Sequence, residues 1–184
     1  MVESVTDSGS KEVQQEKVEK LIERRALIDT LVIQSNLQVE VLVQQPDSER
    51  LVVVINEEFP EEVETTFNIW RDSDGTIVFI GEYPYSESGD WYIEYKHYFN
   101  EAGETFAFER ITNFFNSICT DEVAYERITD FYDSEFRKLH QVYTLTDLEG
   151  DRLNKEECEF HYDYSYEVSK SLDAYLKKIQ YRSK

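Results

Sequence analysis

The sequence predicts an α+β fold: an antiparallel β-meander of about 7–9 strands in a curved sheet, with amphipathic N-terminal and C-terminal helices packed on one face. Three observations support this prediction. Apolar residues recur at helical spacing near both ends of the chain, polar and apolar residues alternate in the middle, and acidic glycine turns recur there at even intervals. We therefore expect a flexible tail over residues 1–10 and a single domain over residues 11–184.

The composition fits a compact but strongly acidic domain. The chain has 184 residues and a formal net charge of −20, and 40% of its residues are hydrophobic. Such a charge argues against binding to nucleic acids through phosphate contacts. No apolar run is long enough for a transmembrane helix.

The two predicted helices rest on stripes of apolar residues. The first covers about Lys11 to Leu31, with Ser10 as a plausible N-cap. The second covers about Val168 to Gln180, with Ser165 as its cap and Lys177 and Lys178 near its end. Both stripes are narrow, so each helix needs a sheet to pack against.

A hairpin is predicted next. Residues 37–43 and 51–55 are rich in β-branched residues, and Gln45-Pro46-Asp47-Ser48 supplies the turn between them. The acidic stretch from Glu57 to Glu62 then interrupts regular structure.

The meander itself is predicted from three turns, which end at Gly75, Gly89 and Gly103. Between them lie segments of strand length. In residues 91–99, the alternation places Trp91, Ile93, Tyr95, His97 and Phe99 on one face of the sheet; Tyr92, Glu94, Lys96 and Tyr98 fall on the other.

Further strands are expected along the rest of the chain. Residues 105–108, 123–132 and 136–146 have strand character, whereas residues 111–119 suit either a strand or two helical turns. A fourth acidic turn ends at Gly150 and Asp151. A last strand is expected after it, with these side chains on one face: Cys158, Phe160, Tyr162, Tyr164 and Tyr166.

Two cysteines, Cys119 and Cys158, leave two alternatives open. We favour buried free thiols over a disulfide between neighbouring strands. Neither cysteine occurs in a CxxC spacing, so zinc binding and thioredoxin-like chemistry have no support.

Few residues point to catalysis. Glu94 and Asp163 are the best-placed carboxylates for an acid/base pair, and His97 with His161 is the best-placed pair for a metal. For all four we favour a structural role in the sheet. The sequence lacks nucleophile, P-loop and dinucleotide motifs, so we expect no cofactor, no metal and, on balance, no enzyme.

The aromatic residues are the strongest sign of a binding surface. The chain has 13 tyrosines and 11 phenylalanines, more than a core of this size requires. Exposed rings on a rigid sheet suit a carbohydrate or a protein ligand. The candidate binding residues are Trp91, Tyr92, Tyr95, Tyr98, Tyr162 and Tyr164. The alternative is that the helices cover these rings.

The segment from Tyr98 to Phe106, a strand followed by an acidic glycine turn and another strand, resembles units of small uncharacterised exported proteins and lipoproteins of bacteria. The resemblance implies no activity. It favours an exported, periplasmic or lipid-anchored location with the signal removed over a cytoplasmic one.

Three functions follow in order of preference. The first is a non-enzymatic binding or interaction module that is exported or associated with the cell envelope. The second is a cytosolic acidic inhibitor of a basic protein, of the immunity or nucleic-acid-mimic type. The third is a hydrolase that depends on a carboxylate pair. The sequence leaves the oligomeric state open.

Overall fold

The computed structural model describes residues 8–48, 50–160 and 166–181. It confirms the α+β class and the antiparallel meander. The elements in chain order are α1 (Ser8–Ile33), β1 (Gln38–Gln44), β2 (Leu51–Val53), β3 (Thr65–Arg71), β4 (Ile77–Pro84), β5 (Trp91–Phe99), β6 (Thr105–Phe114), β7 (Ala124–Tyr132), β8 (Lys138–Thr146), the 3-10 helix η1 (Lys155–Glu157) and α2 (Leu172–Lys178).

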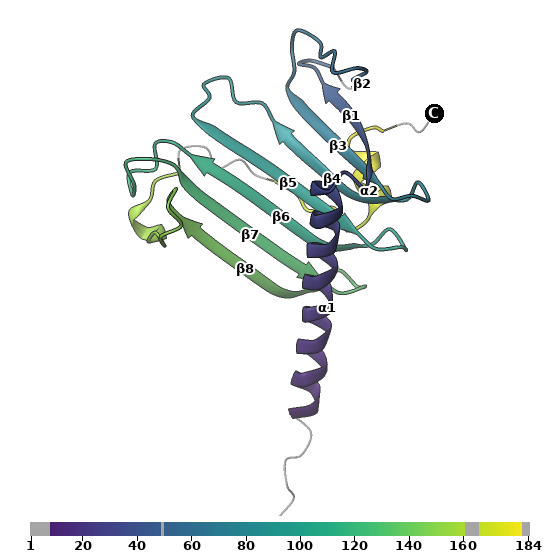
Figure 1. The fold of residues 1–184 in the computed structure, drawn as a ribbon, viewed down its shortest axis with the longest axis vertical. Coiled ribbons are helices and arrows are strands. Elements are labelled where there is room, and N and C mark those ends of the chain that lie inside the picture. Colours follow the sequence, from purple (N-terminus) through teal and green to yellow (C-terminus); the bar gives the residue numbers. More distant parts are fainter. Residues whose placement is uncertain (1–7, 49, 161–165, 182–184) are drawn as a thin grey trace, which may run out of the picture.

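The strands form one eight-stranded antiparallel sheet in the order β2-β1-β3-β4-β5-β6-β7-β8 (Figure 1). From β3 to β8 each strand pairs with the next one in the chain. Only β2 departs from this order, because it pairs with the outer edge of β1 while β3 takes the inner edge.

Glycine turns reverse the chain between strands, as the sequence predicts. Gly75 and Gly103 have φ values of +83° and +74°, a left-handed conformation that glycine adopts without steric cost. Their N–H groups donate to the carbonyl oxygens of Asp72 and Asn100 at 3.0 and 2.9 Å. The side chains of Asp72 and Asn100 in turn accept backbone N–H groups, which fixes each turn.

The predicted alternation along β5 is confirmed, and it defines two faces of the sheet. The α2 face carries Tyr95 and His97, and Tyr175 of α2 packs against His97. The α1 face carries Lys96 and Tyr98, and Tyr98 contacts α1. All β5 residues on the α2 face are buried, and on the α1 face Glu94 and Tyr98 are buried.

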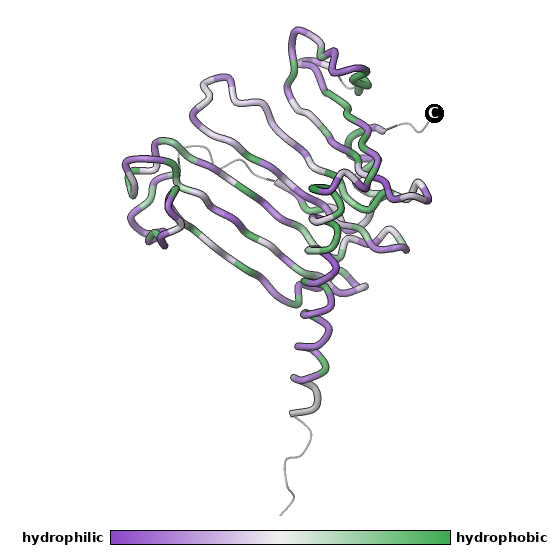
Figure 2. The backbone as a smooth tube through the Cα atoms, in the orientation of Figure 1, coloured by the Kyte–Doolittle hydropathy of each residue, from purple (hydrophilic) through white to green (hydrophobic). Residues whose placement is uncertain are grey.

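On the α1 face, only the second half of α1 lies over the sheet, and its first half projects beyond it (Figure 1). The buried cluster beneath the helix consists of Ile28, Phe79, Tyr98, Phe106, Ala107 and Phe131. The projecting half is largely hydrophilic (Figure 2), and its Val13 is 68% exposed. The helix is therefore held by its C-terminal turns.

The α2 face holds two buried clusters. One lies under α2 and contains Leu42, Phe67, Ile69, Ile77, Ile80, Phe99, Tyr175 and Ile179. The other lies towards β6 and contains Trp91, Ile93, Tyr95, Phe108, Phe114 and Tyr132. Phe160 and Val168 pack against this second cluster, so the chain after β8 covers the part of the face that α2 does not reach.

The two helices lie on opposite faces of the sheet, whereas the sequence analysis placed both on one face. Tyr98 contacts α1 through Asp29, and its neighbour His97 contacts Tyr175 of α2. Adjacent strand residues point to opposite faces. The central strands carry large apolar residues on both faces, so both faces need a cover.

Several element boundaries also differ from the prediction. β3 is an additional strand, and the first part of the ambiguous segment 111–119 extends β6 as far as Phe114. Among the described residues of the predicted last strand, Cys158 to Phe160 and Tyr166 are not in a strand. α2 begins only after Ser171, whose Oγ accepts the N–H of Ala174 and caps the helix.

Cys119 and Cys158 form a disulfide, so the favoured prediction of free thiols was wrong. The β6–β7 connection and the segment after η1 meet at this point. The N–H of Glu159 donates to the carbonyl oxygen of Ser117 at 2.8 Å, which aligns the two segments beside the cysteines. The periodicity of each segment contains no information about this long-range contact.

Candidate functional site

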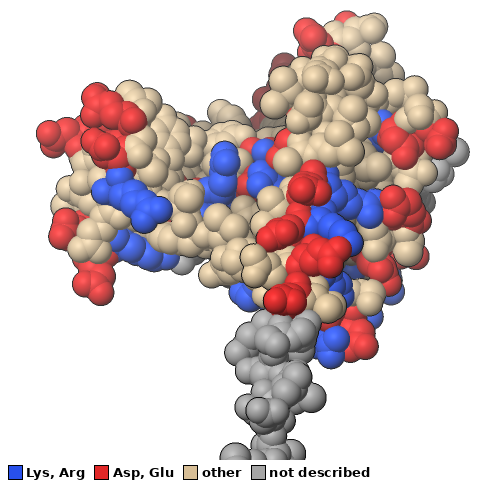
Figure 3. Space-filling view, turned by 60° about the horizontal axis from the view of Figure 1, so that its bottom comes forward, with Lys and Arg blue, Asp and Glu red and all other residues tan. Residues whose placement is uncertain are grey.

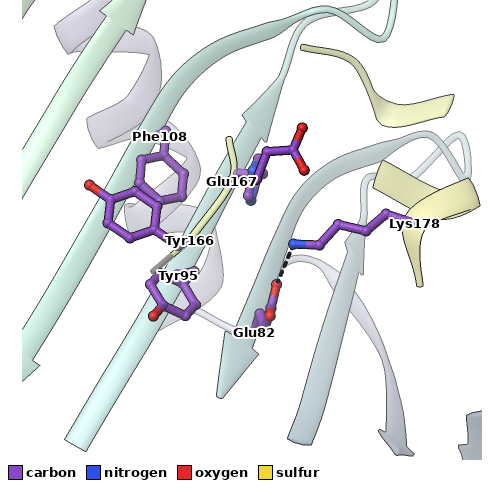
Figure 4. A pocket seen from close by; sticks show the side chains of 7 residues that line it. Glu82, Tyr95, Phe108, Tyr166, Glu167 and Lys178 are labelled. Atoms are coloured by element: carbon purple, nitrogen blue, oxygen red, sulfur yellow. Dashed lines mark ion pairs between the residues drawn. The ribbon is translucent and has the colours of Figure 1, made fainter. Parts of the chain in front are cut away.

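A pocket of about 340 Å³ lies on the α2 face, between the centre of the sheet and the chain that follows it. Strands β4, β5 and β6 form its floor, and the segment before α2 and α2 itself form its walls (Figure 4). The lining residues are Glu82, Tyr95, His97, Phe108, Tyr166, Glu167 and Lys178. This volume is at the lower end of the range for small-molecule sites.

Three aromatic rings form one side of the pocket. The Tyr166 ring stacks on Phe108 at 5.2 Å between centroids and lies 5.3 Å from the tilted Tyr95 ring. Tyr95 and Phe108 are buried, whereas Tyr166 is 38% exposed. Tyr166 therefore presents the accessible ring, and the two strand residues hold it in place.

His97 fixes the floor of the pocket to its wall. Its Nε2 accepts the backbone N–H of Ser169 at 3.2 Å, and its ring lies 4.6 Å from that of Tyr175. Burial, helped by the nearby Lys178 ammonium, lowers the pKa of His97 to about 3. His97 is therefore neutral near pH 7 and anchors the C-terminal segment to β5.

The polar groups of the pocket are two carboxylates and an ammonium. Glu82 accepts a hydrogen bond of 2.7 Å from the hydroxyl of Tyr175, and Lys178 Nζ lies 3.9 Å from the same carboxylate oxygen. Burial, with the adjacent Glu82 carboxylate, raises the pKa of the Tyr175 hydroxyl well above its usual value, so it remains a donor. Glu167 is exposed at the rim.

The structure brings one of the predicted binding residues, Tyr95, into the pocket. Trp91 lies on the same face but is buried in the adjoining core cluster. Tyr92 and Tyr98 lie on the α1 face; Tyr92 is 40% exposed, and Tyr98 is covered by α1. Tyr162 and Tyr164 lie outside the described residues.

Of the four candidate catalytic and metal-binding residues, the described ones, Glu94 and His97, are engaged in hydrogen bonds. Glu94 accepts hydrogen bonds from the hydroxyls of Tyr83 and Tyr92 at 2.7 and 3.2 Å on the α1 face. Asp163 and His161 lie outside the described residues. Within residues 8–48, 50–160 and 166–181, no group of three or more His, Cys, Asp or Glu is arranged to hold a metal ion.

Most of the pocket was missed by the sequence analysis. Glu82, Phe108, Glu167 and Lys178 were not singled out for binding, and Tyr166 was noted only as part of a strand face. The one usable signal was the shared strand face of Tyr95 and His97. The remaining lining residues come from distant segments, and their convergence depends on the path of the chain after β8.

The comparisons identify no relative from which a function could be transferred. The chain matches no protein-family model, and no match is found among curated proteins or solved structures. In the part of the chain that the structure describes, no helix is both long and apolar enough to cross a membrane.

Proposed function

We propose that this protein is a non-enzymatic binding module and that the aromatic pocket on the α2 face is its ligand site. The observation that carries the proposal is the combination of a partly exposed ring, Tyr166, with charged side chains around one cavity of about 340 Å³. Pockets with apolar walls and a few polar groups are the usual form of small-molecule sites.

The arrangement of the pocket supports binding more than catalysis. The Nε2 of His97 is already engaged by a backbone N–H, so it is not available as a general base. The Glu82 carboxylate is engaged by Tyr175 and Lys178. The contacts of Ser169 with His97 and of Tyr175 with Glu82 also hold the walls in place without a ligand, which lowers the entropic cost of binding.

The proposal is tested by screening a panel of small neutral sugars, organic cations and organic acids against the isotope-labelled protein. We expect at least one class to shift the NMR amide signals of Tyr95, His97 and Glu167 in a saturable manner. Replacing Tyr166 by Leu should weaken that binding, whereas replacing Tyr85, 61% exposed and outside the pocket, should not. A panel that leaves the pocket signals unmoved contradicts the proposal.

A second candidate function, inhibition of a basic protein, is supported by the distribution of charge. Exposed carboxylates gather at the end of the sheet where β4, β6 and β8 finish, including Glu87, Asp121, Glu122, Glu149 and Asp151. Figure 3 shows acidic side chains, with some basic ones between them, on the left-hand lobe of the molecule. Such a surface steers cationic partners.

This second function predicts that binding to poly-lysine depends on that end of the sheet. Neutralising Glu87, Asp121 and Glu122 together should slow association more than neutralising Asp74, Glu101 and Glu135, which lie in turns at the opposite end. If both triple variants slowed association equally, the association rate would depend on net charge alone. That result would count against a defined acidic surface.

The disulfide between Cys119 and Cys158 supports an exported or envelope-associated setting, which favours the binding module over a cytosolic inhibitor. Structural disulfides persist mainly in oxidising compartments. The redox state of Cys119 and Cys158 in cells of its source, trapped by acid quenching and thiol alkylation, tests this location. Two free thiols in the trapped protein would contradict it.

A further inference from the structure

We infer that the pocket on the α2 face selects an organic cation, namely an ammonium group on a small apolar body. The inference rests on the proposed function, because it names the ligand class of the same site. Three features support it: the Lys178 ammonium beside Glu82, the aromatic rings next to this pair, and the net charge of the chain.

The pocket already holds an ammonium group of the chain itself. Lys178 extends from α2 towards Glu82, and its Nζ lies 3.9 Å from the carboxylate (Figure 4). The Lys178 side chain is 41% exposed, whereas that of Glu82 is only 17% exposed. Glu82 is thus the more buried partner, held also by the Tyr175 hydroxyl, and Lys178 is the more exposed cation, which a ligand ammonium can replace.

Two cations of the chain already lie on aromatic rings in and beside the pocket. Lys178 Nζ lies 5.7 Å from the centroid of Tyr175, and the Arg110 guanidinium carbon lies 5.2 Å from that of Tyr166. The faces of aromatic rings carry negative partial charge and attract cations at such distances. Tyr166 is still 38% exposed, so part of its ring remains accessible to a second cation.

The charge of the pocket and of the whole chain also favours cations at longer range. Glu82 and Glu167 outnumber Lys178 among the charged lining residues, and the chain has a net charge of −20. The field of the protein therefore repels anions and accelerates the approach of cations, and added salt weakens both effects. A neutral sugar that stacks on Tyr166 would gain nothing from these charges.

The role of Lys178 gives the sharpest test. If Lys178 competes with a ligand cation for Glu82, replacing it by Met keeps the apolar stem and removes the competitor. The affinity for a cation should then rise, whereas a sugar or an anion would lose a hydrogen-bond donor and bind more weakly. Lys177→Met is the matched control, because it causes the same charge change on the same helix outside the pocket lining.

The experiment measures binding of butylammonium, tetramethylammonium, butyrate and methyl glucoside by calorimetry and by NMR shifts of the pocket amides. We expect only the two cations to bind. Butylammonium should bind about fivefold more tightly to Lys178→Met than to Lys177→Met, the size of one partly exposed ion pair. Glu167→Gln should weaken it about fivefold relative to the exposed, non-lining carboxylate variant Glu159→Gln.

The outcomes separate this inference from the proposed function. Binding of methyl glucoside or butyrate in the pocket without binding of the cations overturns the inference and leaves the binding module intact. Weaker cation binding in Lys178→Met also overturns it. If no probe of any charge moves the pocket signals, both the inference and the proposed function fail.

Discussion

The hydroxyl of Tyr98 donates a hydrogen bond of 2.7 Å to the carboxylate of Asp29, which joins the middle of the sheet to the last turns of α1. Burial first, and then the Glu109 and Asp29 carboxylates, raises the pKa of Tyr98 well above its usual value, so the hydroxyl stays protonated. Arg25 binds the same Asp29 at 2.9 Å. This contact fixes how α1 crosses the sheet.

Replacing Tyr98 by Phe should therefore lower the free energy of unfolding by about 1.5 kcal/mol, the contribution of a hydrogen bond to a charged group. The ring remains in the core, so the loss reports the hydroxyl alone. Urea denaturation measures it. Tyr85→Phe, at an exposed tyrosine, is the control, and equal midpoints for the two variants would contradict this role of Tyr98.

The second prediction concerns Glu109, a fully buried carboxylate on the α1 face. Arg25 lies 2.9 Å, Arg127 3.6 Å and Lys96 3.7 Å from its oxygens. Glu109→Gln leaves these cations without their shared partner, and the free energy of unfolding should fall by about 3 kcal/mol.

The matched control for Glu109 is Glu122→Gln at an exposed position in the β6–β7 turn. It should leave the urea midpoint unchanged. If Glu109→Gln were as stable as the wild type, the ion pair between Glu109 and Arg25 would not contribute to holding α1 on the sheet.

The third prediction concerns the disulfide, which closes a loop across a sequence separation of 39 residues. Replacing both Cys119 and Cys158 by Ala should cost about 4 kcal/mol, because the unfolded chain regains the freedom that the cross-link removes. Thermal unfolding of the oxidised wild type and of the double variant measures the difference. Labelling of two free thiols in the unreduced protein would contradict the pairing.

The fourth prediction is a dependence of stability on pH that comes from His97. Its pKa in the folded protein is about 3, below the value of about 6.5 expected in the unfolded chain. Between these values the unfolded state binds the proton and the folded state does not. Stability should therefore fall as the pH is lowered from about 6.5 towards 3, by up to about 1.4 kcal/mol per pH unit from this residue.

His97→Gln isolates this effect from the many carboxylates that titrate in the same range. The amide oxygen of Gln can still accept the Ser169 N–H, but the side chain does not take up a proton. The difference in unfolding free energy between wild type and variant should shrink as the pH falls. If the unfolding free energies of wild type and variant changed in parallel between pH 6.5 and 4, the pKa of His97 would not be lowered by folding.

The sequence was informative where structure is local. Gly75 and Gly103 marked the turns because a left-handed residue needs glycine, and the alternation in residues 91–99 identified both faces of β5. It failed for the chain after β8. The alternation from Cys158 to Tyr166 has the period of a strand, yet the described residues there pack against the sheet without joining it.

The same limit applies to the site. Tyr95 was identified because its strand face was rich in rings, and that face does line the pocket. Lys178 was interpreted only as a cation that complements a helix end. Its approach to Glu82 requires α2 to lie on that face of β4, and no local pattern encodes such a tertiary contact.

The walls of the pocket come from residues that follow the entire sheet in the chain. During synthesis all eight strands leave the ribosome before Tyr166, Glu167 and Lys178 do. The cavity therefore does not exist until these residues have been made, and a chain clipped after β8 would lose the pocket walls. The ability to bind a ligand would thus be acquired last, when the C-terminal segment has packed against the sheet.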